Sequence, residues 1–324
     1  MIVSSRSNSP ADLAELLPPD LRDRLDRLDV HSRRILRGRL PGDRASRRRG
    51  QSVEFDDHRP YRPGDDLRHV DWNIYTRLDR LFLKLFREED DLAVHVLVDV
   101  SASMDAAAGG RPSKRVVALR LAAALGYVAL VNQNRLFVRS LGEASPEQVG
   151  PMRGRRSVER LGRALVSLAS RPTPPPGRTP ALEQESRAIA RQRLDRGVCL
   201  VISDFLAQED PGPALRLLAS AGGRSGPMDG VCLQVLDPAE LDPALARDDG
   251  LVGDLRLIDA ESGAPRSVTV TDRLVKAYAS ALDRRQQRLL RGVRSAGFRH
   301  AMMTTDEDIA AFMLHRLRSM QIVR

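Results

Sequence analysis

The stretch that most constrains the fold is LAVHVLVDVSASM, residues 92–104. Its first half is a continuous apolar run rich in β-branched residues, which is typical of a strand buried on both faces of a parallel sheet. The run then turns polar at Asp99, Ser101 and Ser103, whose side chains all carry oxygen. α/β proteins bind ligands beyond the carboxyl ends of their parallel strands, and oxygen ligands suit Mg²⁺ or Mn²⁺ better than zinc. The stretch predicts either a cation-binding loop or a plain turn in which Ser103 or Ser113 caps a helix.

The rest of the chain alternates strands with helices. Residues 197–205, GVCLVISDF, repeat the design of an apolar run that ends in an acidic residue, here Asp204. Further strands are expected at 136–141, 231–236 and 298–304, and helices at 114–133, 157–169, 272–295 and 306–318. This alternation predicts an α/β fold with a doubly wound, mostly parallel sheet over residues 91–324. Residues 239–270 are expected to insert a β-hairpin into it.

Residues 1–90 form a separate N-terminal segment in this prediction. Leucines at helical spacing indicate a helix over residues 21–36. Residues 33–49 hold eight Arg and one acidic residue, which suits a solvated face or a docking strip for an acidic partner or anionic lipid. Residues 50–71 are dense in Gly, Pro and paired charges, and a short strand is expected at 81–86. An Arg–carboxylate network that fixes this turn-rich loop is favoured over catalysis.

Charge and cysteine content limit the partners and the compartment. The net charge of +9 invites a nucleic-acid partner, but aromatic residues make up only 4% of the chain, too few for base-stacking platforms. No nucleic-acid-binding motif is present, so such a partner is not expected. Cys199 and Cys232 lie inside apolar runs, which predicts buried free thiols in a reducing compartment. Without a signal peptide or a membrane-spanning apolar stretch, the expected location is the cytoplasm.

Residues 99–103 match the D-x-S-x-S signature of the von Willebrand factor A domain, and this stretch strongly resembles the metal-ion-dependent adhesion site of that domain. Two later segments resemble the other motifs of the site, a G-x-T loop that ends at Thr179 and the strand end at Asp204. Phe205 departs from the pattern, because many A domains have Gly there. Thr179 precedes Pro180 and is also a good helix N-cap, which is the alternative reading of that loop.

The resemblance implies specific roles for the five residues. Ser101 and Ser103 would bind Mg²⁺ or Mn²⁺ directly, and Thr179 would do so in one conformational state. Asp99 and Asp204 would act mainly through bound waters. Such a cation keeps an open position, which an Asp or Glu of a partner protein would fill.

A long spaced pattern over residues 50–77 closely resembles the bacterial family catalogued as domain of unknown function 58. It reads G-x-x-x-E-F, then R-x-Y-x-P-G-D-D-x-R-x-x-D-W and a following T-R. The matched residues are Gly50, Glu54, Phe55, Arg59, Tyr61, Pro63, Gly64, Asp65, Asp66, Arg68, Asp71, Trp72 and Arg77. The resemblance implies a von Willebrand A-like domain, a MoxR-type AAA+ ATPase as partner and, often, membrane-anchored proteins with similar domains. The block itself would brace the sheet or dock the ATPase, and bracing is favoured.

These features predict a non-enzymatic, metal-dependent adaptor that works with a MoxR-type ATPase in the assembly or maturation of client proteins. The segment GGRPSK lacks the Gly that precedes Lys in a phosphate-binding loop, and no nucleophile elbow is present. Ser101 stands where a haloacid dehalogenase-like phosphatase needs its second carboxylate. Two alternatives remain: a metal-dependent hydrolase that uses Asp99, and an Arg-rich binder of nucleic acid or membrane surfaces.

Overall fold

The computed structural model describes residues 10–30, 32, 54–62, 65, 67, 70–87, 92–107, 109–175, 182–192, 194–195, 197–206, 210–222, 226–242 and 253–324. The chain divides into two compact units. The larger consists of Met1–Gly38 with Leu92–Arg324, and the smaller of Arg39–Asp91. Each unit is described by itself.

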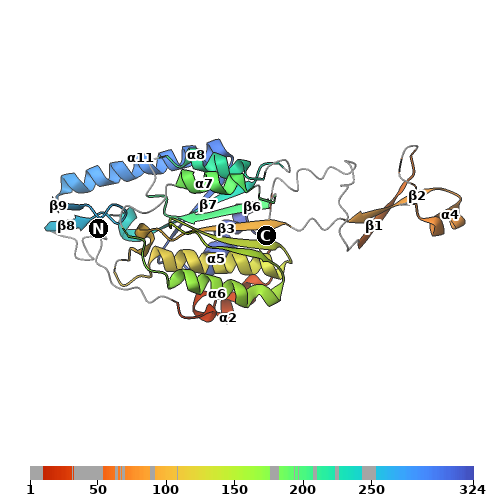
Figure 1. Cartoon of the computed structure of the whole chain (residues 1–324), viewed down its shortest axis with the longest axis horizontal. Coiled ribbons are helices and arrows are strands. Elements are labelled where there is room, and N and C mark those ends of the chain that lie inside the picture. The colour runs from red at the N-terminus through yellow and green to blue at the C-terminus, as the bar shows by residue number, and fades with distance from the viewer. Residues whose placement is uncertain are drawn as a thin grey trace. The chain divides into compact units, whose positions relative to one another are not determined.

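A six-stranded sheet forms the centre of the larger unit (Figure 1). Its strand order is β10-β7-β6-β3-β4-β5. The strands are β3 (Ala93–Asp99), β4 (Arg135–Leu141), β5 (Gln148–Met152), β6 (Gly197–Ser203), β7 (Asp229–Leu236) and β10 (Arg299–Thr304). All neighbours pair in parallel except β5, which runs antiparallel to β4 at one edge. The predicted fold class, a doubly wound and mostly parallel α/β sheet, is confirmed.

Helices cover both faces of this sheet (Figure 1). One face carries α1 (Leu13–Leu16), α2 (Pro19–Leu25), α5 (Lys114–Val131), α6 (Val158–Ala169), α12 (Ile309–Ala311) and a π-helical turn (Phe312–Leu317). The other carries α7 (Leu182–Arg191), α8 (Gly212–Ser220) and α11 (Asp272–Ala296). Successive β3 side chains serve opposite faces, because Val96 and Val98 pack in the first core and Leu97 in the second.

The predicted hairpin insertion is confirmed, with narrower limits. β8 (Asp254–Ile258) pairs antiparallel with β9 (Pro265–Thr269). The first residues of the predicted range belong instead to the short helix α9 (Pro238–Leu241). Asp237 precedes this helix and forms a capping box with Glu240, which is a strong local signal for a helix start.

The predicted helix over residues 21–36 was too long. α2 ends at Leu25, and Val30 forms an antiparallel bridge with Val323 near the chain's other end. Tertiary contacts overrule the helical spacing here, because Leu28 and Val30 are buried and Asp26 accepts a 2.6 Å hydrogen bond from the Tyr127 hydroxyl. Since α1 and α2 pack on α6 and α5, the first helices belong to the larger unit.

The smaller unit is a two-stranded antiparallel hairpin with one short helix. β1 (Glu54–Pro60) pairs with β2 (Phe82–Arg87), and α4 (Trp72–Leu78) lies between them in the chain. Asp71 caps α4 by accepting hydrogen bonds from the Asn73 and Ile74 amides, and its other oxygen lies 3.0 Å from His58 Nε2. His58 is thus a structural hydrogen bonder. Strand β1 was not predicted within the turn-rich segment.

Neither cysteine is bonded to another, and both are buried. Burial raises the pKa of Cys199 to about 12 and also raises the pKa of Cys232. The prediction of buried free thiols is confirmed. Among the helices that the structure describes, none has the length and hydropathy needed to cross a membrane.

Candidate functional site

The candidate site lies where the carboxyl ends of β3 and β6 meet. The chain runs from β3 outward through β4 and β5 on one side and continues through β6, β7 and β10 on the other. Such a change of direction is the topological switch point at which α/β sheets bind ligands. Asp99 is the last residue of β3, and Asp204 directly follows β6.

Asp99 is held in place by neutral donors. The Ser101 amide donates a 2.9 Å hydrogen bond to Asp99 Oδ1, and the Ser203 hydroxyl donates a 2.5 Å bond to Oδ2. Gly142 adopts φ +81° beside it, and a Cβ at this position would lie 2.9 Å from Asp99 Oδ1. Burial, together with the nearby Asp204 charge, raises the pKa of Asp99 to about 6. No fixed cation neutralises it among these contacts.

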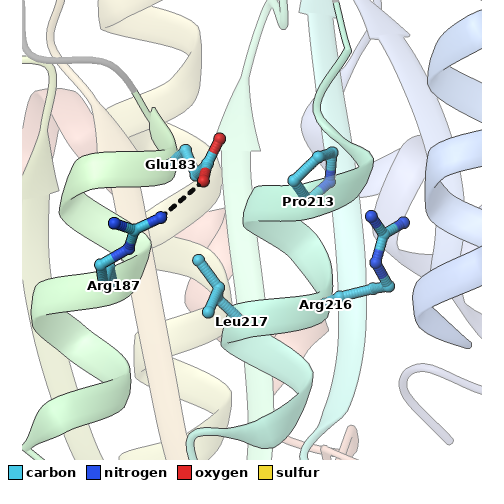
Figure 2. Close-up of a pocket in the computed structure, with 5 residues that line it drawn as sticks. All are labelled: Glu183, Arg187, Pro213, Arg216 and Leu217. Carbon is cyan, nitrogen blue, oxygen red and sulfur yellow. Dashed lines mark hydrogen bonds and ion pairs between the residues drawn. The ribbon is translucent and has the colours of Figure 1, made fainter.

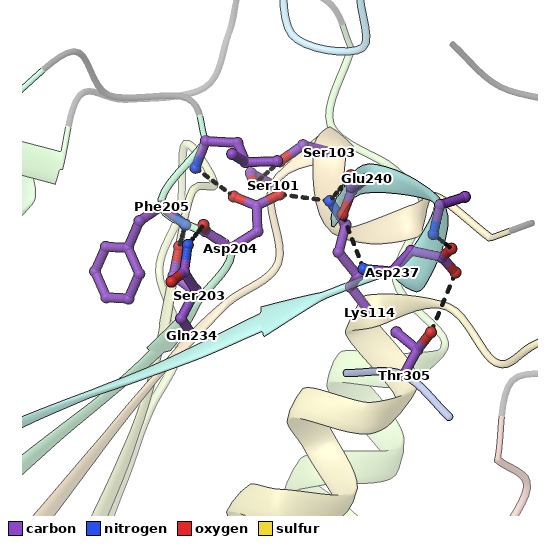
Figure 3. Close-up of polar contacts among 12 residues, drawn as sticks. Ser101, Ser103, Lys114, Ser203, Asp204, Phe205, Gln234, Asp237, Glu240 and Thr305 are labelled. Carbon is purple, nitrogen blue, oxygen red and sulfur yellow. Dashed lines mark hydrogen bonds and ion pairs between the residues drawn. The ribbon is translucent and has the colours of Figure 1, made fainter. Parts of the chain in front are cut away.

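The two hydroxyls of the D-x-S-x-S motif converge. Ser101 Oγ and Ser103 Oγ lie 3.2 Å apart, and the Ser103 side chain also hydrogen-bonds Asp204 (Figure 3). In an octahedral Mg²⁺ shell with bonds of 2.0–2.1 Å, adjacent ligand oxygens lie about 3 Å apart. The spacing of the two hydroxyls therefore suits two neighbouring ligands of one small cation.

Lys114 is a member of the site that the sequence reasoning missed. Its ammonium donates hydrogen bonds of 2.8 Å to Asp204 Oδ2 and 2.6 Å to Glu240 Oε1 (Figure 3). Burial alone would lower the pKa of Lys114, but the charges of Asp204 and Glu240 outweigh burial and raise it. Burial alone would raise the pKa of Asp204, but the Lys114 ammonium and the Leu206 amide outweigh it, so this pKa is lowered.

A sequence signal for Lys114 did exist. It is the first residue of α5, directly after the N-cap Ser113. A positive charge is unfavourable at a helix N-terminus, where the backbone dipole is itself positive. The other signal is the surrounding segment, which is apolar enough for almost every residue of α5 to be buried. A lysine in such a helix requires a buried anionic partner.

The Lys114 contacts connect the site to a second set of polar residues. Glu240 also accepts a 2.9 Å hydrogen bond from the Asp237 amide, and the Asp237 carboxylate accepts bonds from Arg111 at 3.0 and 3.2 Å. The hydroxyl of Thr305, which follows β10, donates to the same carboxylate at 3.1 Å (Figure 3). The carboxyl ends of β3, β6, β7 and β10 are therefore joined by one hydrogen-bonded network.

Glu185 on α7, like Glu240, is an acidic residue that was not predicted to belong to the site. Its carboxylate accepts the Gly142 amide at 3.0 and 3.2 Å. Burial raises the pKa of Glu185 to about 8, and the Asp99 charge adds to this rise while the Gly142 hydrogen bond opposes it. The side of the site near Asp99 thus holds two carboxylates that are costly to ionise.

The turn after β6 explains the departure from the A-domain pattern. Phe205 has φ +52°, a left-handed conformation that favours glycine. Its amide donates a 2.9 Å hydrogen bond to the Ser203 hydroxyl, and its ring is buried in the second core. Core packing and the amide contact hold a bulky residue in the conformation that Gly adopts freely.

The other predicted site residues have separate places. Thr179 lies outside the described residues. Thr173, six residues before it in the chain, donates its hydroxyl hydrogen to Asp105, which also pairs with Arg115 at 2.8 Å. Asp105 is therefore engaged by two side chains and not simply solvated.

The residues of the family pattern lie in the smaller unit. Asp71 caps α4, Trp72 and Arg77 are exposed on this helix, and Asp65 accepts a 2.8 Å hydrogen bond from the Arg62 amide. Tyr61 donates its amide to Leu81. Gly64, Asp66 and Arg68 lie outside the described residues, as do the side chains of Glu54 and Arg59.

A hollow of about 290 Å³ lies away from these residues, between α7 and α8. Its lining includes Arg187, Arg216 and Leu217 (Figure 2). Arg187 is paired with Glu183 on the same helix at 2.9 Å. Of the predicted cation ligands that the structure describes, Asp99, Ser101, Ser103 and Asp204, none lines this hollow.

The donor set at the strand ends fits a small divalent cation. The carboxylates of Asp204 and Glu240 share the Lys114 ammonium, and that of Asp99 interacts with the Arg115 guanidinium only through its charge. Two hydroxyls lie at ligand spacing beside them. Within the described part of the chain, no group of three or more His, Cys, Asp or Glu side chains is arranged to hold a metal ion. A cation here would therefore depend on the serine hydroxyls as well as the carboxylates.

The chain is similar to several bacterial proteins. It is 29% identical over 304 residues to uncharacterized proteins of Mycobacterium tuberculosis and Mycobacterium bovis, which covers 93% of this chain and 91% of theirs. Among solved structures it is similar to an aerotolerance-related membrane protein of Bacteroides fragilis, with 14% identity, a TM-score of 0.38, and coverage of 71% of this chain and 98% of that one. It is also similar to a von Willebrand factor type A protein of Catenulispora acidiphila, with 12% identity, a TM-score of 0.32, and coverage of 74% and 43%. The family model described as "Protein of unknown function DUF58" matches residues 57–288, and the chain belongs to this family.

Proposed function

We propose that this protein is a non-enzymatic interaction module that binds an acidic side chain of a partner through Mg²⁺ or Mn²⁺ at the carboxyl ends of β3 and β6. The observation that carries the proposal is the pair of serine hydroxyls 3.2 Å apart beside the carboxylates of Asp99 and Asp204. Family membership and the α/β fold agree with a protein-interaction domain.

Each residue has a defined part in the proposed site. Ser101 and Ser103 would hold the cation directly, while Asp99 and Asp204 would hold its waters, and Thr179 would complete the set from the third loop. The bound cation supplies a positive charge with an open position, which attracts a carboxylate. Because Lys114 already pairs with Asp204, less protein charge is left to neutralise the cation, and its attraction for an incoming carboxylate is greater.

Asp99 is poorly suited to act as a nucleophile. Both of its oxygens accept hydrogen bonds, from the Ser101 amide and the Ser203 hydroxyl. These contacts fix the carboxylate and reduce its nucleophilicity, which supports a binding role over hydrolysis.

The proposed partner is a MoxR-type AAA+ ATPase, and the module would present client proteins to it for assembly or maturation. Membrane-anchored proteins with A-like domains are further candidates. The basis is the family to which the chain belongs. The resemblance of the chain to this family implies such an ATPase as partner. The two free buried thiols suit the reducing cytoplasm, where the interaction is proposed to take place.

The test is a binding measurement between the purified full chain and the purified MoxR-type ATPase encoded nearest to its gene, in Mg²⁺ and in EDTA. We expect at least tenfold weaker binding in EDTA and for the Ser101→Ala/Ser103→Ala variant. The matched control is Ser170→Ala/Ser319→Ala, which removes two exposed hydroxyls and should bind like the wild type. Equal binding in Mg²⁺ and EDTA would remove the cation from the proposal, and no binding under either condition would remove the ATPase.

A further inference from the structure

The turn of the β8–β9 hairpin contributes a carboxylate to the candidate site. The Ser103 amide donates a 3.0 Å hydrogen bond to Glu261 Oε1, a contact across 158 residues of sequence. Ser103 is the motif residue whose hydroxyl meets both Ser101 and Asp204. A glutamate of the chain itself is therefore seated beside the two proposed cation ligands.

The hairpin turn is built to present this glutamate. Asp259 Oδ1 accepts hydrogen bonds from the Ser262 amide at 2.6 Å and the Ser262 hydroxyl at 2.7 Å. The Gly263 amide closes the turn on the Asp259 carbonyl at 2.8 Å, and Gly263 has φ +71°. These bonds fix the backbone on both sides of Glu261, so its side chain is directed at the site at a low cost in conformational entropy.

We infer that Ser103 forms part of a carboxylate-binding site, and that Glu261 is its intramolecular ligand, which a partner's Asp or Glu must displace. The identity of the displacing ligand rests on the proposed function above. The contact joins two groups of the chain itself, the Ser103 amide and the Glu261 carboxylate. The hairpin thus competes with a partner's carboxylate for the same site, and a partner must bind more tightly than Glu261 does.

The electrostatics make this internal ligand displaceable. Glu261 brings a further negative charge to a site where the carboxylates of Asp99, Asp204 and Glu240 already outnumber the cations Lys114 and Arg115. An intramolecular ligand on a short tether acts at an effective concentration of about a millimolar. A partner that makes further contacts outside the site can bind tightly enough to outcompete Glu261. Its binding then shifts the hairpin from the state in which Glu261 is bound to the state in which it is released.

The test uses amide NMR of the ¹⁵N-labelled full chain in EDTA, with the Ser103 amide signal as readout. Glu261→Ala removes the acceptor, and Glu159→Ala on the exposed face of α6 is the matched control. Each protein is titrated with N-acetyl-glutamic acid amide and, separately, with its neutral analogue N-acetyl-glutamine amide. We expect the Ser103 signal to differ from its wild-type position in Glu261→Ala but not in Glu159→Ala. In Glu261→Ala, the acidic probe should bring the signal back toward the wild-type position.

The expected result is a response of Glu261→Ala to the acidic probe at least tenfold stronger than that of the wild type or Glu159→Ala, and none to the neutral probe. An unchanged Ser103 signal in Glu261→Ala, or an equal probe response in all three proteins, would overturn the inference. A repeat in Mg²⁺ addresses the proposed function separately. If Mg²⁺ does not change the probe response, the proposed role of the cation is contradicted. The contact between Ser103 and Glu261 is still supported by the measurements in EDTA.

Discussion

β3 and β6 end in the same way, with an apolar run followed by an aspartate, yet the two carboxylates lie in opposite surroundings. Asp99 is contacted by a neutral amide and a neutral hydroxyl, and burial with the nearby Asp204 raises its pKa to about 6. Asp204 receives the Lys114 ammonium at 2.8 Å, and its pKa is lowered despite burial. Asp204 thus has a cation hydrogen-bonded to its carboxylate, whereas Asp99 has none among its hydrogen bonds and interacts with the Arg115 guanidinium only through its charge. The difference indicates that a bound cation would be stabilised most by the carboxylate of Asp99.

The largest expected effect comes from removing the counter-charge of Asp204. In Lys114→Met, the buried carboxylates of Asp204 and Glu240 lose their shared ammonium. Breaking a buried ion pair from one side costs about 3–5 kcal/mol, and we expect this loss in urea unfolding at pH 7. Lys276→Met, at an exposed position of α11, should change stability by less than about 0.5 kcal/mol. Equal stability of the two variants would show that Asp204 does not depend on Lys114.

The next prediction tests the side of the site near Asp99, where Glu185 lies. The pKa of Glu185 is about 8 in the folded chain against 4.5 for the unperturbed group. A raised carboxyl pKa means that ionisation costs the folded state, so the stability from this group is present below about pH 4.5 and is lost as the pH rises toward 8. Glu185→Gln removes that cost and keeps an acceptor for the Gly142 amide.

We expect Glu185→Gln to gain stability relative to the wild type as the pH rises from 4.5 to 8, by roughly 2–4 kcal/mol. The measurement is chemical unfolding at several pH values in EDTA, with Glu159→Gln as the exposed control. A difference that stays constant with pH would show that Glu185 is not strained by burial. If Mg²⁺ reduces the gain, a cation bound near Asp99 makes the ionised Glu185 carboxylate less costly.

The backbone beside Asp99 provides the third prediction. Gly142→Ala places a methyl group 2.9 Å from Asp99 Oδ1 at φ +81°, so the variant has both backbone strain and a clash. Gly110→Ala, at φ +70° with nothing within 4 Å, has the strain alone. We expect losses in unfolding free energy of about 2–3 kcal/mol and about 1 kcal/mol respectively. A Cβ at Gly142 would also lie 2.9 Å from the Ser101 amide nitrogen and Cβ. Similar losses in both variants would therefore mean that the Asp99 carboxylate and the Ser101 backbone can both move away at no cost.

The sequence predicted the strand ends well because their signals are local. An apolar run followed by a polar turn is written in consecutive residues, and so β3, β6 and the positions of Asp99 and Asp204 were correctly placed. The hairpin insertion and the long helix α11 were also predicted from local patterns. The doubly wound sheet follows from their alternation.

What the sequence did not predict depends on contacts between distant residues. Lys114 meets Asp204 across 90 residues and Glu240 across 126, and Glu261 meets Ser103 across 158. No pattern in one sequence specifies such pairs. α2 was predicted too long for the same reason, because the bridge between Val30 and Val323 joins opposite ends of the chain.

The smallest expected effect comes from an ion pair that, unlike the buried pair of Lys114 and Asp204, is exposed to solvent. Glu183 and Arg187 on α7 lie 2.9 Å apart at i and i+4, with about half of each side chain exposed. Exposed helix pairs contribute about 0.3–0.5 kcal/mol, and Glu183→Gln should lose no more than that. The loss should vanish at about 1 M salt, where the screening length falls to about 3 Å. The Lys114→Met loss should persist at the same salt concentration, because buried charges are screened much less. If both losses respond equally to salt, then the Lys114 ammonium is reached by solvent, and the contrast between Asp99 and Asp204 does not arise from burial.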